Sequence, residues 1–160
     1  MPSVPLDLTP PDHTAEHRVL IVTGAHLRAE AADRPLAYRL RHQMLEWWAK
    51  QAAGAADDAA FEKPSVIVCS DVWYLNNDDL RVLPTVSIGG PGVNALSAFL
   101  TERLPGVFTV ANVLTVQMDI ELIDPVVNIW GMDHQTTVAA LDAFVERYLD
   151  HFMRRACAAA

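Results

Sequence analysis

The chain has 160 residues, of which 51% are hydrophobic, and its formal net charge at pH 7 is −8. This length favours one compact domain with a sizeable core. The negative charge argues against broad nucleic-acid binding, because such binding depends on neutralising phosphates with Lys and Arg. No apolar run approaches the ~20 residues that span a bilayer. We therefore expect neither nucleic acid nor a membrane as a partner.

The first residues of the chain do not resemble a secretion signal. Residues 1–16 are rich in proline and lack both a basic region and a long apolar core, so we interpret them as a flexible leader. We expect one α/β domain over residues 17–156, a loose tail over 157–160, and a cytoplasmic protein. The two cysteines, Cys69 and Cys157, have no metal-type spacing. No metal site is predicted, and the sequence identifies no cofactor.

The first structural elements are a strand and a helix. Residues 17–24 are continuously apolar at their centre, which predicts a strand covered on both faces. We expect a polar loop over 25–33. Asp33 would then cap a helix that continues to about Gln51, and Pro35 suits the first turn of that helix.

The middle of the chain predicts two more buried strands and a glycine-rich turn. Residues 64–71 form the second predicted strand, and 73–80 a loop with one helical turn at most. Residues 85–88 form the third predicted strand. The turn at 89–94 then leads into an amphipathic helix, which Pro105 ends.

The pattern changes in the last third of the chain. Residues 114–121 alternate between apolar and polar side chains, which predicts a strand with one wet face in an antiparallel or edge position. Residues 126–130 predict another strand, and a final helix begins near Asp133. Strands that alternate with helices predict βαβ units. We therefore expect a three-layer α/β domain, Rossmann-like or flavodoxin-like, whose mainly parallel sheet gains a late antiparallel strand or hairpin. This general plan is similar to flavodoxin-like and nucleoside-processing α/β domains, in architecture alone.

Parallel strands would bring four loops to the carboxyl edge of the sheet, where open α/β sheets usually bind ligands. Backbone amides and the positive end of a helix make the turn at 89–94 a candidate anion site. Polar and aromatic side chains that converge on one crevice predict a small-molecule site. The expected catalytic residues are Asp71 and His134. The expected ligand-binding residues are Gly89, Gly90, Gly92, Asn94, Trp73, Tyr74, His26 and Asp133.

Each of these residues also has a structural interpretation, and the sequence leaves both open. The glycines at 89–92 can serve only to let strand and helix pack closely, with Gly90 as a helix N-cap. Asp133 stands where an N-cap belongs, and we favour that role. Asp71 can equally bond the amides of its own turn. His134 would lie in a first helical turn, where the dipole keeps it neutral and able to act as a base.

Two functions from different classes follow from these features. The first is a small-molecule binding domain, with or without catalysis, that holds an anionic, nucleotide-like or phosphorylated ligand at the carboxyl edge. The alternative is a non-catalytic interaction module that self-associates or binds a protein partner, through Trp47, Trp48 and the strand edge at 114–121. The four converging loops favour the first. The glycine turn lacks the spacing of a dinucleotide fold and the Lys-Ser/Thr of a P-loop.

Overall fold

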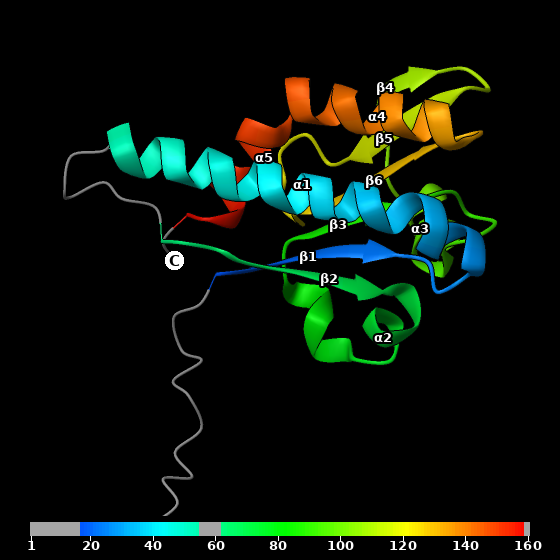
Figure 1. Cartoon of the computed structure of the whole chain (residues 1–160), viewed down its shortest axis with the longest axis horizontal. Coiled ribbons are helices and arrows are strands. Elements are labelled where there is room, and N and C mark those ends of the chain that lie inside the picture. Colours follow the sequence, from blue (N-terminus) through cyan, green and yellow to red (C-terminus); the bar gives the residue numbers. More distant parts are fainter. Residues whose placement is uncertain (1–16, 55–61, 159–160) are drawn as a thin grey trace, which may run out of the picture.

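The structure is a computed structural model that describes residues 17–54 and 62–158 (Figure 1). Six strands form one sheet in the order β2-β1-β3-β6-β5-β4. The sheet is mostly parallel and ends in an antiparallel hairpin, so the predicted α/β, Rossmann-like character is confirmed. The expected leader at 1–16 lies outside the described residues. Cys157, expected in the tail, is buried in the core.

The four parallel strands all end at one edge of the sheet. They are β1 (Arg18–Thr23), β2 (Ser65–Ser70), β3 (Thr85–Ile88) and β6 (Val126–Gly131). Each agrees with a predicted strand to within one residue at either end. Continuous apolar runs made these strands visible, since a strand buried on both faces needs apolar side chains at nearly every position.

Helix α1 (Leu27–Gly54) begins earlier than the sequence suggested. Its first turn is closed by His26, whose carbonyl and Nδ1 accept hydrogen bonds from amides of that turn. The predicted loop at 25–33 and the predicted N-cap role of Asp33 are therefore wrong. Pro35 lies inside the helix but is exposed, so the carbonyl that loses its usual partner can face water. None of the helices in the described residues is both long and apolar enough to cross a membrane.

The segment before β3 is also more helical than expected. Between β2 and β3 the chain forms α2 (Asp71–Leu75) and the 3-10 helix η1 (Asp78–Val82). After β3, helix α3 (Ala95–Thr101) begins behind Asn94, whose Oδ1 accepts hydrogen bonds from two amides of its first turn. The N-cap is therefore Asn94, and the interpretation of Gly90 as the cap is wrong.

The hairpin consists of β4 (Gly106–Val110), which the sequence did not reveal, and β5 (Leu114–Met118). β5 pairs with β4 on one side and with β6 on the other, both antiparallel. The expected exposed edge at 114–121 is therefore wrong, because β4 occupies it. Val116 is completely buried. Gln117 is also buried, and its side-chain amide donates two hydrogen bonds to backbone carbonyls.

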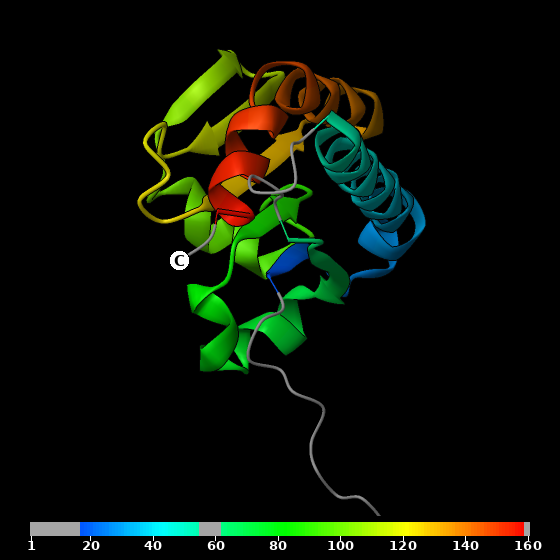
Figure 2. The same ribbon diagram turned by 90° about the vertical axis from the view of Figure 1, so that its left-hand side faces the viewer.

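The helices pack in two groups. Helices α1, α4 (His134–Arg147) and α5 (Leu149–Ala156) share one hydrophobic cluster with Val19 and Ile21 of β1. Helices α2 and α3 share the other cluster with Leu20 and Val22. In Figure 2, α1 (cyan), α4 (orange) and α5 (red) lie together, and α2 (green) lies apart from them. Alternate side chains of β1 thus serve different cores, as the pleat of a strand requires.

Candidate functional site

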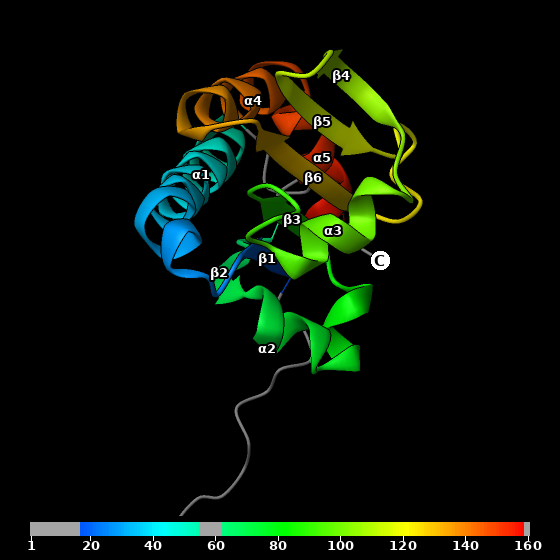
Figure 3. The same ribbon diagram turned by 90° about the vertical axis from the view of Figure 1, so that its right-hand side faces the viewer.

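A cavity of about 700 Å³ opens at the carboxyl edge of the sheet, between the first turns of α1 and α4. Figure 3 faces this edge and shows both helices beginning there. The positive ends of two helix dipoles therefore lie beside one cavity. The loop after β3 and the end of β6 complete the wall. The wall includes Arg28, Asp33, Gly90, Gly92, Trp130 and His134.

Four of the ten predicted site residues line this cavity, namely Gly90, Gly92, Asp133 and His134. The amides of Gly90 and Gly92 donate no hydrogen bond within the described part of the chain. They are therefore available to an acceptor from outside. A Cβ placed on Gly92 would meet no atom within 4 Å, so packing does not require glycine there.

Gly89 shapes the site from behind. Its φ of +110° is one that side chains disfavour, and a Cβ on it would lie 2.5 Å from Oδ2 of Asp33. Its amide donates to the carbonyl of Ile129 on β6, at 3.0 Å. Gly89 thus fixes the loop to the sheet and leaves room for the Asp33 carboxyl.

Asp71 is buried, and its carboxylate is fully engaged by backbone amides. Oδ1 accepts hydrogen bonds from Ala25 at 2.9 Å and Val72 at 2.8 Å, and Oδ2 accepts one from Ala95 at 2.8 Å. One carboxylate therefore joins the loop after β1 to the starts of α2 and α3. This arrangement favours the structural interpretation of Asp71, and our proposal below does not use it in catalysis.

Asn94 is likewise 1% exposed and committed to the fold. Besides capping α3, it donates through Nδ2 to the hydroxyl of Ser87 and the carbonyl of Ile88, each at 3.0 Å. The loop that Asn94 ends must also pass very close to Gly24, because a Cβ there would lie 1.7 Å from the carbonyl oxygen of Val93. These contacts hold the glycine loop in place beside the cavity.

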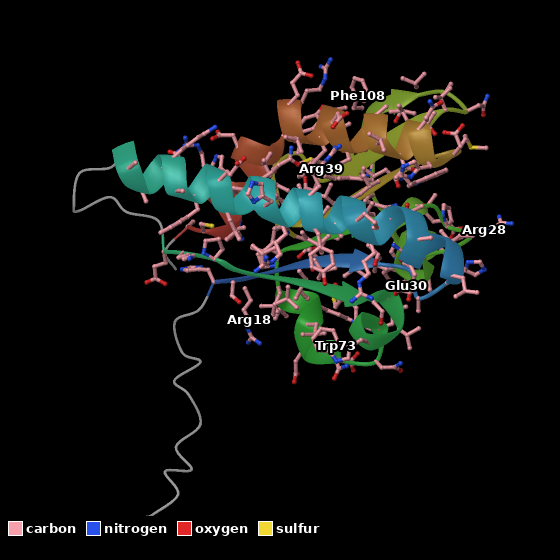
Figure 4. All side chains as sticks on the ribbon, in the orientation of Figure 1. Arg18, Arg28, Glu30, Arg39, Trp73 and Phe108 are labelled. Atoms are coloured by element: carbon pink, nitrogen blue, oxygen red, sulfur yellow. The ribbon has the colours of Figure 1, made fainter. Side chains whose placement is uncertain are left out.

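The remaining predicted ligand contacts lie elsewhere. Tyr74 is buried in the cluster under α2 and α3, and Trp73 lines a separate cavity of about 420 Å³ beside β2. Figure 4 shows Trp73 on α2 and Arg28 in the first turn of α1. His26 is exposed, with Nδ1 accepting from the amide of Arg28. The structure does not bring these three predicted residues into the cavity.

At the start of α4, Asp133 forms a capping box. Its Oδ1 accepts from the amide of Thr136 at 2.8 Å, and the Thr136 hydroxyl accepts from the amide of Asp133 at 2.9 Å. The backbone and side-chain hydrogen bonds from Thr136 hold the pKa of Asp133 below its ordinary value. These contacts agree with the favoured structural interpretation of Asp133. His134, which follows it, is exposed.

Asp33 is the cavity residue that sequence reasoning missed. It is 6% exposed, and its carboxyl forms no hydrogen bond or ion pair within residues 17–54 and 62–158. Burial raises its pKa from 3.8 to about 6, an effect that the nearby charge of His134 partly opposes. A carboxyl in this range can exchange a proton near neutral pH. The helical spacing of Ala29, Asp33 and Ala37 was the available signal, because it puts Asp33 on a buried stripe.

Trp130 is the second missed residue. It is the penultimate residue of β6, lines the cavity, and lies beside the glycine loop, since a Cβ on Gly90 would come within 3.7 Å of its ring. Its ring gives the cavity an aromatic wall. Together with Arg28 and His134, these residues give the cavity cationic, carboxyl and aromatic components. Comparison of the chain with protein-family models, with curated proteins and with solved structures gave no match.

Proposed function

We propose that this chain binds a small anionic molecule, a nucleotide or a phosphorylated metabolite, in the cavity at the carboxyl edge of a three-layer, flavodoxin-like domain. One observation carries the proposal: two unbonded loop amides and a buried, unpartnered carboxyl line the same cavity. Buried polar groups in proteins are nearly always hydrogen-bonded, so an exception at a cavity points to an external partner.

The anionic group would bind at the glycine loop. The amides of Gly90 and Gly92 would donate to its oxygens, and the first turns of α1 and α4 add the positive ends of their dipoles. Arg28 supplies a full positive charge on the same wall and forms no ion pair within the described part of the chain. The rest of the ligand would lie between Trp130 and Asp33. The cavity volume lies within the range of small-molecule sites.

The variant Gly92→Val tests the anion site. A ligand at 100 times its Kd stabilises a fold by about 2.7 kcal/mol, which for a domain of this size raises Tm by about 5 °C or more. We expect AMP, GMP or ribose 5-phosphate to raise the Tm of the natural chain in a thermal-shift assay. The same ligands should leave the Tm of Gly92→Val unchanged, because the valine side chain would occupy the mouth of the site.

Gly54→Val is the matched control. A Cβ on Gly54 also meets no atom within 4 Å, and Gly54 ends α1 far from the cavity. This variant should keep the full ligand-induced shift. The proposal fails if none of the ligands shifts the natural chain, or if Gly92→Val responds as strongly as Gly54→Val.

A further inference from the structure

The unpartnered carboxyl of Asp33 restricts what the ligand can be. The charged side chains that share the cavity wall with it are Arg28, Asp133 and His134, and none is within ion-pair distance of it. Its Oδ2 lies against Gly89, which has no side chain to offer a donor. A ligand in the cavity can therefore supply the hydrogen-bond donors that this carboxylate lacks within the described part of the chain.

A carboxylate binds most strongly to two parallel N–H donors, one for each oxygen. Among nucleobases, guanine presents such a pair, because its N1–H lies beside its 2-amino group. Adenine presents an N1 lone pair beside its 6-amino group, so that one carboxylate oxygen would face a lone pair. Hypoxanthine keeps the N1–H and lacks the amino group. Guanine also offers a flat face that can stack on an aromatic wall such as Trp130.

Guanine nucleotides combine this donor pair with the phosphate that the glycine loop suits. We propose that the ligand is a guanine nucleotide, and that Asp33 recognises it by accepting hydrogen bonds from N1–H and the 2-amino group. The phosphate binds at Gly90 and Gly92, and the base packs beside Trp130. This inference rests on the proposed function of the cavity and adds the identity of the base.

Isothermal titration calorimetry at neutral pH and fixed salt, with GMP, IMP, AMP and ribose 5-phosphate, tests the inference. IMP lacks one hydrogen bond to a charged group, so it should bind about tenfold more weakly than GMP, and AMP more weakly still. Asp33→Asn should lose this preference and still bind ribose 5-phosphate. Asp142→Asn removes the same charge from the exposed surface of α4 and should retain the preference.

A change of specificity provides the second arm. An asparagine presents one acceptor and one donor, which matches the N1–H and the 2-carbonyl of xanthine. Asp33→Asn should therefore bind XMP more tightly than GMP, a gain that a merely structural role for Asp33 cannot produce. Equal affinity of the natural chain for all four phosphates, or a preference for AMP, would overturn the guanine assignment and leave the proposed function standing. No binding of any of them would overturn both.

Discussion

Replacing Asp71 by alanine should lower the free energy of unfolding by about 3–5 kcal/mol. The buried carboxylate accepts hydrogen bonds from the amides of Ala25, Val72 and Ala95, and each amide would lose a charged acceptor. Domains of this size are commonly stable by only about 5–15 kcal/mol, so the loss is a large fraction of the total. Urea denaturation followed by circular dichroism measures it.

The control is Asp78→Ala, since the Asp78 side chain is 86% exposed and forms only a surface pair with Arg81. That change should cost less than about 1 kcal/mol. If Asp71→Ala were as stable as Asp78→Ala, the Asp71 carboxylate would not be what joins the loop after β1 to the starts of α2 and α3.

Asp33→Asn should have the opposite effect at pH 7. Relative to its effect at pH 4, the substitution should stabilise the protein by about 1–2 kcal/mol. Burial raises the pKa of Asp33 from 3.8 to about 6, so the folded protein holds this proton more tightly than the unfolded chain does. Protonated Asp33 therefore makes its whole contribution to stability below pH 3.8, and this contribution is lost as the pH rises through about 6. Asparagine never ionises and avoids this loss.

Urea denaturation of both proteins at several pH values between 4 and 7 measures the difference. Asp142→Asn is again the matched control, because it removes a carboxyl from the exposed surface of α4. A pH-independent effect of Asp33→Asn, or destabilisation at pH 7, would mean that the Asp33 carboxylate has a partner in the free protein. A residue that costs stability and also binds the ligand is a familiar feature of functional sites.

The parallel strands were predictable because burial on both faces leaves an apolar run in the sequence. β4 was not, since Gly106–Val110 is a short edge strand with mixed exposure and no alternating pattern. The predicted start of α1 was wrong because Asp33 and Pro35 are residue types that commonly occupy the first positions of a helix. Only the packed structure distinguishes a proline in a first turn from one on an exposed helical face.

The location of the candidate site was more predictable than its residues. Gly90, Gly92 and His134 follow strands whose carboxyl ends share an edge, and the cavity lies there. Asp71 and Asn94 also follow buried strands, yet they bond amides of neighbouring loops that are distant in the sequence. No local pattern reveals such bonds, because they depend on how closely the loops approach one another.

The most direct test of the cavity as a ligand site is amide chemical-shift mapping by NMR during a titration with GMP. We predict that the largest changes occur at Gly90, Gly92 and the first turn of α4, with smaller ones in the first turns of α1. The chemical shift of the Trp130 indole N–H should change together with these amides. Changes scattered over the surface, or a spectrum unaltered at saturating GMP, would contradict the account.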